Sequence, residues 1–315
     1  KIDSTYHKFG GSYEIYSGMT GAENRMARSL EYFGGYTSIR DTILNVSNSA
    51  RAFDMPTAYG LGYSFQFRRL FSLSLDYRKQ IWSSNPFFDT KGKYTDRSDY
   101  GVSLVIHPKS PMVPTVHANW RYFEMYDDNG NVINSWFGGG QDLTPYYLFE
   151  EDAIHFHQTC KTACDKHNPD FYPKYKKQCD DYFWNAHRNE ARGVGGLFFD
   201  YLKATEEQSM EDWYNFVTEV GNSFLDAYLP IVAKRKDLPF TTEQRTWQEI
   251  RRGRYVEFNL VHDKGTLFGL KTNGRIESIL MSLPPHVQWH YDHHPVAGSE
   301  EEKVVKVLEN PKNWI

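Results

Sequence analysis

The stretch that most constrains the fold is residues 114–124, with the sequence PTVHANWRYFE. It is rich in β-branched and aromatic residues and contains no glycine, so we predict a β-strand. Because side chains alternate between the two faces of a strand, His117, Asn119 and Arg121 share one face and the opposite face is apolar. The polar face indicates either a binding site or pairing with an acidic strand, and the strand alone does not decide between them.

Three consecutive glycines at 138–140 follow this strand and come just before Asp142. Glycine lets the backbone approach a ligand closely or adopt a positive φ. Thr144 and Pro145 then predict the N-cap and the first residue of a helix. We therefore expect a glycine-rich loop that holds the Asp142 carboxylate beside Arg121, which suits recognition of N–H groups on a polar ligand. The spacing of a phosphate-binding loop is absent.

Composition excludes some classes of function. The chain has 315 residues, with 36 Lys and Arg against 40 Asp and Glu, so no overall basic field favours nucleic acid. No apolar run reaches the length of about 18 residues expected of a transmembrane helix. Cys160, Cys164 and Cys179 form no Cys-x-x-Cys pair. We expect Cys160 and Cys164 to be small buried apolar residues on one helix face rather than a disulfide, and a reducing compartment fits best. The chain begins at Lys1 without a signal-like segment, and a removed presequence stays open.

Hydrophobic periodicity predicts strands and helices in separate blocks, which is typical of an α+β fold. Strands are expected at residues 12–16, 63–67, 102–108, 114–124 and 197–199, the third of them central in its sheet. Helices are expected at residues 26–32, 150–167, 172–191, 213–228 (ending at Pro230 or continuing past it), 242–251 and 300–310. Three further strands, forming an antiparallel meander, are predicted at residues 255–261, 266–272 and 275–283. No repeat or linker marks a domain boundary.

The twelve histidines raise the question of a metal site. His155 and His157 would point about 200° apart on the predicted helix. His290 and Asp292 resemble half of an iron facial triad, but they fit polar surface residues better. The chain has no His-Glu-x-x-His motif, serine nucleophile elbow or dinucleotide-binding loop.

Three arginines lie at positions with special backbone geometry. Arg121 is on the polar strand face, Arg192 precedes a glycine turn, and Arg275 follows the turn Asn273-Gly274. Guanidinium groups at such positions often bind carboxylates. For each arginine alone, a surface ion pair is a comparable interpretation; together with Asp142, the three favour a site.

Several longer motifs resemble those of oxygen-dependent coproporphyrinogen III oxidases: residues 105–108, 117–124, 136–145, 177–200 (including NAHRNEARGVGG at 185–196) and 251–260. The resemblance covers about residues 101–315, and residues 1–100 are poorly matched. Gln178 stands where the family usually has Trp, and Asn273 where Gly is common. The resemblance implies a single domain over residues 1–315, built on a large flat antiparallel β-sheet flanked on both faces by α-helices. It also implies a homodimer, which we expect to form through the 255–290 strand region.

The activity that the resemblance implies is oxidative decarboxylation of the ring A and B propionates of coproporphyrinogen III to vinyl groups. O2 is the co-substrate, protoporphyrinogen IX is the product, and no organic cofactor takes part in this step of haem and porphyrin biosynthesis. A metal has been proposed for some members, and His107, His117, His157 and His187 occupy the positions that would serve. The predicted elements do not bring these four together, so we expect no metal. The expected compartment is the cytoplasm, with the mitochondrial intermembrane space or a plastid as alternatives after presequence removal.

The resemblance also implies roles for single residues. Asp142 would accept hydrogen bonds from pyrrole N–H groups, His117 would donate a proton, and Arg121 completes the expected catalytic set. The expected substrate-binding residues are Ser103, Asn119, Trp120, Arg121, Arg192, Asn273, Gly274 and Arg275. Two alternatives remain: a non-catalytic tetrapyrrole-binding protein, and an iron-dependent oxygenase that uses His290, Asp292 and a third histidine.

Overall fold

The computed structural model describes residues 11–18, 26–31, 57–67, 71–82, 95–127, 129–271 and 276–315, with side chains described from residue 101 onward. The chain divides into two compact units. The first comprises residues 1–104, 119–138 and 201–210, and the second comprises residues 105–118, 139–200 and 211–315. The prediction of a single domain over residues 1–315 stays a prediction.

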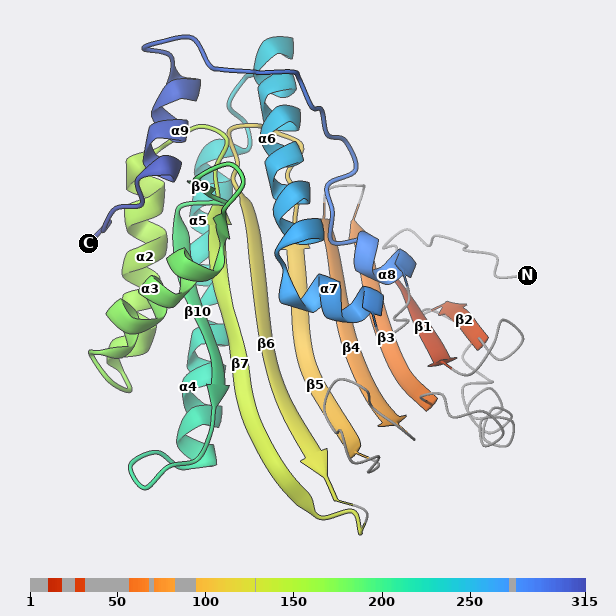
Figure 1. Cartoon of the computed structure of the whole chain (residues 1–315). Helices are drawn as coiled ribbons and strands as arrows, with labels where there is room; N and C mark the ends of the chain where they lie inside the picture. The colour runs from red at the N-terminus through yellow and green to blue at the C-terminus, as the bar shows by residue number, and fades with distance from the viewer. Residues whose placement is uncertain are drawn as a thin grey trace. The chain divides into compact units, whose positions relative to one another are not determined.

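The first unit is built of β-strands (Figure 1). They are β1 (Gly11–Gly18), β2 (Met26–Glu31), β3 (Thr57–Phe67), β4 (Phe71–Trp82) and parts of β5 (Thr95–Ile106), β6 (Thr115–Tyr126) and β7 (Val132–Thr144). Hydrogen-bonded neighbours follow the order β7-β6-β5-β4-β3-β1-β2. β1 is antiparallel to both of its neighbours, with Tyr13 opposite Leu30 on β2 and opposite Tyr63 on β3. The predicted strands at 12–16 and 63–67 are confirmed, and so is the central position of the strand at 102–108.

The helix predicted at 26–32 is wrong, because Met26–Glu31 forms strand β2. Its backbone groups pair with β1 along the whole strand. Pairing with a neighbouring strand satisfies backbone N–H and C=O groups as fully as a helix does, so it overrides a weak local helix preference.

The second unit combines sheet and helices (Figure 1). Its parts of β10 (Gly195–Leu202), β7, β6 and β5 are neighbours in that order. The helices are α2 (Glu150–Asp165), α3 (Phe171–Tyr182), α4 (Met210–Asn222), α5 (Phe224–Arg235), α6 (Thr242–Val261), α7 (Lys264–Lys271), α8 (Ile276–Leu280) and α9 (Glu300–Glu309), with a short hairpin of β8 (Trp184–Asn185) and β9 (Glu190–Ala191) between α3 and β10. The α+β class and the antiparallel sheet are confirmed, and the flanking of both sheet faces by helices stays a prediction.

Aromatic side chains make the core of the second unit. Tyr175 on α3, Phe199 on β10 and Phe216 on α4 contact one another, with ring centroids 5.1 to 5.5 Å apart. All three are almost fully buried. Such pairs stabilise a fold by about 0.5–1.5 kcal/mol beyond the area they bury, so they join the helices to the sheet. The three cysteines are free and buried in this unit, which confirms the burial predicted for Cys160 and Cys164.

Several helix predictions need new boundaries. The helices at 150–167 and 300–310 are confirmed as α2 and α9. The helix predicted at 172–191 ends at Tyr182, because the chain then turns into the β8–β9 hairpin. The helix predicted at 213–228 is two helices, α4 and α5, and the second continues past Pro230.

The strands predicted between residues 255 and 283 are wrong. The described residues of this region form the end of α6, then α7 and α8, while residues 272–275 lie outside the described part of the chain. α6 starts with a capping box at Thr241 and Gln244, and it buries Trp247, Arg251 and Tyr255 at four-residue spacing. This spacing is helical and continues beyond residue 251, where the prediction ended the helix. The expected dimer contact through a 255–290 strand region therefore has no strand in its described residues.

Gly253 lies two residues beyond the predicted helix end at residue 251, but it is inside α6. A Cβ atom at this position would be 2.8 Å from the backbone oxygen of Gln288. The glycine is therefore required by the close packing of another segment against the helix.

Candidate active site

Three of the predicted residues meet in the second unit. Nδ1 of His117 lies 2.7 Å from Oδ1 of Asp142. Nη2 of Arg192 donates a hydrogen bond of 2.7 Å to Oδ2 of the same carboxylate. The Asp142 and Arg192 side chains are each 3% exposed, whereas the His117 side chain is 23% exposed. The arrangement is a buried carboxylate held between a buried cation and a partly accessible imidazole.

Strand β6 presents His117 as the sequence predicts. Val116 and Ala118, on either side of it, are fully buried, whereas His117 points to the other face and keeps some exposure. This alternation is the period of two expected for a strand.

The glycines before Asp142 do not form the predicted loop. They lie inside β7, which continues to Thr144. A Cβ atom on Gly140 would be 2.1 Å from the backbone oxygen of Leu197, and one on Gly196 would be 2.0 Å from the backbone oxygen of Gln141. Glycine is thus needed on both strands because β7 and β10 approach each other closely. Asp142 is held on a hydrogen-bonded strand, which fixes a side chain better than a loop does.

The helix start predicted at Thr144 and Pro145 is also wrong. Thr144 is the last residue of β7, and α2 begins at Glu150 with Phe149 as its N-cap. A Ser, Thr, Asp or Asn before an apolar run indicates an N-cap only where the backbone is free to turn, and here Thr144 belongs to the sheet.

Arg192 is enclosed by aromatic rings. Its guanidinium carbon lies 3.8 Å from the ring centroid of Phe183, 4.7 Å from that of Tyr255 and 5.0 Å from that of Phe258. Its Nη1 donates to Oδ1 of Asn259 at 3.1 Å. Cation–π contacts are strongest when the cation is shielded from water, so this cage stabilises a buried charge.

Asp142 and Arg192 each favour the charged form of the other. Burial alone would raise the pKa of Asp142, but the charges of Arg192 and His117 and their hydrogen bonds lower it below its usual value. Burial likewise opposes the Arg192 charge, but Asp142 raises the arginine pKa. Asp142 is therefore ionised at neutral pH. Since an ionised carboxylate only accepts hydrogen bonds, His117 must carry a proton on Nδ1, and Nε2 is the ring nitrogen that Asp142 does not engage.

The remaining predicted site residues belong to the first unit or lie outside the described residues. Ser103, Asn119, Trp120 and Arg121 belong to the first unit, where Nη1 of Arg121 donates to Oδ1 of Asn119 at 2.8 Å. Asn273, Gly274 and Arg275 lie outside the described residues. The substrate-binding and catalytic roles of all these residues stay predictions.

The four histidines proposed for a metal have separate partners. His107 contacts the Ser282 oxygen and Thr115, His117 contacts Asp142, His157 contacts Tyr172 and the Val194 oxygen, and His187 contacts His262 and Glu257. Among the described residues, no group of three or more His, Cys, Asp or Glu side chains is arranged to hold a metal ion. Burial lowers the pKa of His107 to about 3 and that of His157 to about 4, so both are neutral. Whether the protein uses a metal stays a prediction.

The aromatic rings that surround the Arg192 guanidinium were not predicted from the sequence. Tyr255, Phe258 and Asn259 lie on one face of α6, three and four residues apart. A helical assignment for residues 252–261 would have placed these three side chains together. The predicted strands instead put Tyr255 and Phe258 on opposite faces.

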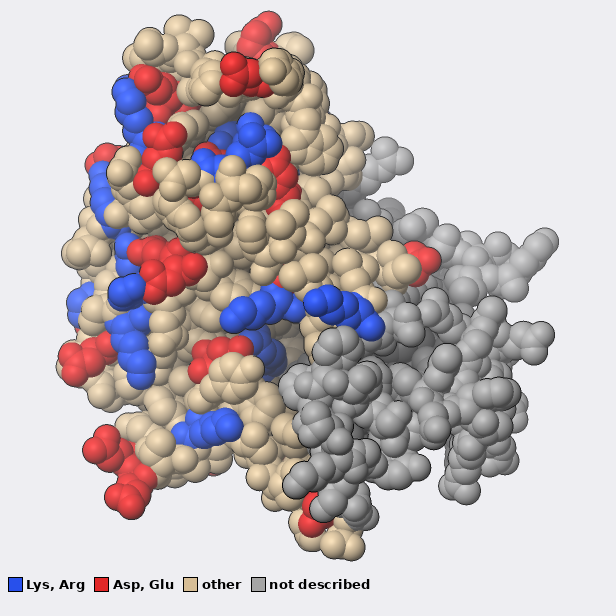
Figure 2. Space-filling model, in the orientation of Figure 1, with Lys and Arg blue, Asp and Glu red and all other residues tan. Residues whose placement is uncertain are grey.

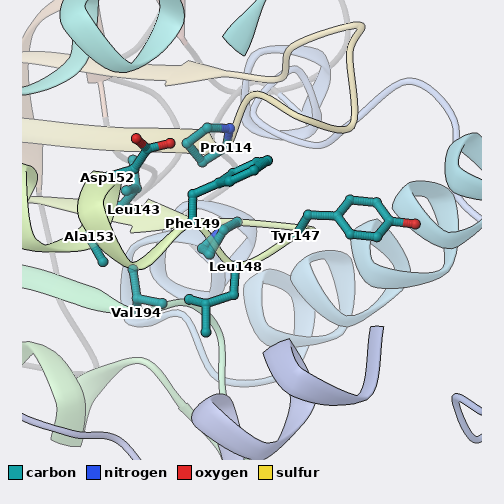
Figure 3. A pocket seen from close by; sticks show the side chains of 9 residues that line it. Pro114, Leu143, Tyr147, Leu148, Phe149, Asp152, Ala153 and Val194 are labelled. Atoms are coloured by element: carbon teal, nitrogen blue, oxygen red, sulfur yellow. The ribbon is translucent and has the colours of Figure 1, made fainter. Parts of the chain in front are cut away.

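A small pocket lies on the other side of β7 (Figure 3). Its lining is mostly apolar and includes Pro114, Leu143, Phe149 and Val194. Leu143 follows Asp142 on the strand, so the two side chains point to opposite faces. The pocket is therefore separated from the carboxylate by the strand, and it is not the site described above.

Charges of both signs are mixed on the face of the molecule seen in Figure 2, where Lys and Arg side chains lie among Asp and Glu. Within the described part of the chain, no helix has the length and apolar character needed to cross a membrane.

Comparison with known proteins gives consistent matches. A family model described as coproporphyrinogen III oxidase matches residues 77–314. This match begins 24 residues before residue 101, where the resemblance seen in the sequence motifs begins. The chain is 57% identical over 218 residues to the chloroplastic oxygen-dependent coproporphyrinogen-III oxidase of Glycine max, covering 68% of this chain and 56% of that protein. It is 58% identical over 215 residues to the oxygen-dependent coproporphyrinogen-III oxidase of Francisella tularensis subsp. holarctica (strain OSU18), covering 68% of each chain. The barley (Hordeum vulgare) chloroplastic protein is 56% identical over 218 residues, and the match spans 55% of its length. The matches thus span little more than half of the two plant relatives.

Proposed function

The chain belongs to the coproporphyrinogen III oxidase family, and from this premise we propose that it decarboxylates the ring A and B propionates of coproporphyrinogen III with O2. The products are protoporphyrinogen IX, with vinyl groups in place of the two propionates, and CO2. The observation that carries the proposal is the His117–Asp142–Arg192 cluster, because all three residues lie in the matched segment and share one buried hydrogen-bonded arrangement.

The chemistry requires a base, an electron acceptor and exclusion of water. Each propionate anion breaks its bond to the carboxyl carbon and loses one β-hydrogen, giving a vinyl group, CO2, a proton and two electrons. One O2 per propionate accepts the two electrons together with that proton and a second proton from the medium, and it is reduced to hydrogen peroxide. The Asp142 carboxylate, kept ionised by Arg192, accepts hydrogen bonds from pyrrole N–H groups and so makes the ring electron-rich. Nε2 of His117 exchanges the proton, because Nδ1 is committed to Asp142.

The test is turnover by purified protein treated with a chelator. The protein is mixed with coproporphyrinogen III without oxygen, O2 is then added, and tetrapyrrole products and CO2 are measured. We expect protoporphyrinogen IX with two CO2 per substrate. Substrate binding with no CO2 would contradict the proposal and indicate a tetrapyrrole-binding protein. Activity that returns only with added iron would indicate the iron-dependent oxygenase.

Two variants show whether the cluster is responsible. Asp142→Asn keeps the size of the side chain but removes the charge, and we expect no measurable turnover. The matched control is Asp181→Asn, which also removes one carboxylate charge; Asp181 is 64% exposed and pairs with Lys177 on α3. The control should turn over at the parent rate. Circular dichroism checks that both are folded, and a parent rate in Asp142→Asn would remove Asp142 from the mechanism.

We also propose that the chain forms a homodimer. The helical region that replaces the predicted strands exposes apolar side chains, with Leu270, Ile276 and Leu280 each 37 to 48% exposed, and such side chains favour a protein contact when they are contiguous. Sedimentation equilibrium of the parent and of Leu270→Glu tests this, and a parent that stays monomeric would contradict it. The cytoplasmic location stays a prediction, and the chloroplastic names of the two plant relatives support the plastid alternative for members of that kind.

A further inference from the structure

Residues 193–195, which form the turn after Arg192, can adopt many backbone conformations. Val194 is flanked by Gly193 and Gly195, and Gly195 has a φ of +87°, in the region that favours glycine. Glycines on both sides allow many backbone conformations, so the sequence itself does not fix this turn. Arg192 must nevertheless place its Nη2 within 2.7 Å of Asp142. The position of the guanidinium therefore depends on contacts from outside the turn.

The Arg192 N–H donates to the backbone oxygen of Phe183 at 2.8 Å, and the contacts that hold the turn after Arg192 converge on the peptide groups of Val194. Its N–H donates to the backbone oxygen of Leu143 at 2.9 Å, which ties the turn to the strand that carries Asp142. Its carbonyl oxygen accepts two hydrogen bonds, from Nε2 of His157 at 3.0 Å and from Nε1 of Trp314 at 3.1 Å. His157 is fully buried and Trp314 is 8% exposed. One carbonyl thus uses both of its lone pairs on two buried donors.

The two donors are themselves held in place. The Val194 oxygen can only accept, so the proton of the neutral His157 ring is on Nε2. Nδ1 therefore accepts from the Tyr172 hydroxyl, which lies 3.0 Å away. The imidazole and the Trp314 indole are stacked, with centroids 6.3 Å and planes 25° apart. The backbone oxygen of Lys312 accepts a bond of 3.1 Å from the buried Nζ of Lys176 on α3. The segment around Trp314 is therefore anchored to the helices.

We propose that Trp314 is a positioning residue for the active site. With His157, its indole N–H fixes residues 193–195 so that Arg192 stays on the Asp142 carboxylate, and Asp142 in turn holds the Nδ1 proton of His117. The effect of Trp314 on turnover rests on the proposed function, whereas its effect on the His117–Asp142 contact does not. A misplacement of about 1 Å at catalytic groups can reduce a rate about 100-fold, so loss of one anchor should be measurable.

The test compares Trp314→Phe with Trp289→Phe. The first substitution keeps an aromatic ring on His157 and removes the N–H donor to Val194. The second is a matched control, because Trp289 also donates through Nε1, to Oε1 of Glu257 at 3.0 Å, but it is 53% exposed and has no contact with the turn. Three quantities are measured for each variant: kcat and KM separately, the thermal unfolding midpoint, and the NMR signal of the His117 Nδ1 proton in protein labelled with ¹⁵N-histidine.

We expect Trp314→Phe to lower kcat at least tenfold with little change in KM, and to shift or broaden the His117 Nδ1–H signal, while Trp289→Phe leaves both as in the parent. A purely structural role would change the unfolding midpoint but neither kcat below that temperature nor the His117 signal. An unchanged His117 signal in Trp314→Phe overturns the proposal. If the parent protein shows no turnover, the proposed function fails, and the NMR signal alone still decides the role of Trp314.

Discussion

The free energy held in the buried Asp142–Arg192 pair can be tested directly. Asp142→Asn removes the negative charge and leaves the Arg192 cation enclosed by Phe183, Tyr255 and Phe258, with its side chain 3% exposed. Removing one partner of a buried ion pair costs about 3–5 kcal/mol, because the remaining charge is uncompensated. We expect urea unfolding at pH 7 to show a loss of this size.

The single and double variants should also differ in stability. Arg192→Met places an apolar side chain in an aromatic cage, and with Asp142→Asn it leaves no buried charge. The double variant should therefore be more stable than Asp142→Asn alone, by about 1–3 kcal/mol, and the double-mutant cycle gives the coupling. Asp181→Asn, an exposed partner of Lys177, should change stability by no more than about 0.5 kcal/mol. A loss below about 1 kcal/mol in Asp142→Asn would refute the view that Arg192 depends on Asp142 for its burial.

The sign of the pH effect follows from the lowered pKa of Asp142. A carboxyl group whose pKa is lower in the folded state than in the unfolded chain binds fewer protons when folded. Its contribution to stability is fully present above the unfolded value of about 3.9 and is lost as the pH falls through the folded value. The parent should therefore lose this stability below about pH 4, and Asp142→Asn should lack that part of the acid dependence.

Three further predictions concern packing, thiols and acid. Gly196→Ala should destabilise the protein by more than about 3 kcal/mol in urea unfolding, because its Cβ would lie 2.0 Å from the Gln141 oxygen. The control Gly130→Ala has nothing within 4 Å of its Cβ and should cost about 1 kcal/mol from its positive φ alone. Equal losses in the two variants would contradict the close approach of β7 and β10. Burial raises the pKa of Cys160 to about 12, so a thiol reagent at pH 8 should leave it unmodified in the native protein and label it after unfolding; native labelling would contradict its burial. Burial lowers the pKa of His157 to about 4, so the unfolded chain binds more protons between pH 6.5 and 4, and about 3 kcal/mol of stability should be lost as the pH falls through that window. His157→Gln should lose less over the same range, and a parent whose stability does not change between pH 7 and 5 would contradict the neutral buried imidazole.

Much of the candidate site could be predicted from the sequence because it lies on a strand with a clear pattern. The alternation around His117 gave its face correctly, and the glycines before Asp142 indicated a close backbone approach. The approaching group is strand β10 rather than a ligand. A row of glycines predicts proximity of backbone, but it does not say whether the neighbour is a ligand or another strand, since both satisfy the same steric requirement.

Residues 255–283 could not be predicted in the same way, because the side chains at the start of this region fit both a helical and a strand period. The segment 255–261 alternates enough to suggest a strand, and Tyr, Val and Phe favour β-structure locally. The burial of Trp247, Arg251 and Tyr255 at four-residue intervals shows that packing of a long α6 decides the outcome. At residues 26–32 the opposite occurs: a helix was predicted, and pairing with β1 makes Met26–Glu31 a strand. In both cases a long-range contact outweighs a local preference that is worth only tenths of a kcal/mol per residue.

The placement of Arg192 changes how its predicted role must be read. The resemblance implies that Arg192 binds a substrate propionate, but its Nη2 donates to Asp142 and its Nη1 donates to Asn259 within the aromatic cage. A propionate that reached this guanidinium would displace Asn259 from Nη1 more easily than Asp142 from Nη2. The bond from Nη2 to Asp142 is shorter and joins opposite charges. Asn259→Ala would remove the weaker competitor. A lower KM in that variant would support direct binding of a propionate by Arg192, whereas an unchanged KM with altered kcat would assign Arg192 to holding Asp142 ionised beneath His117.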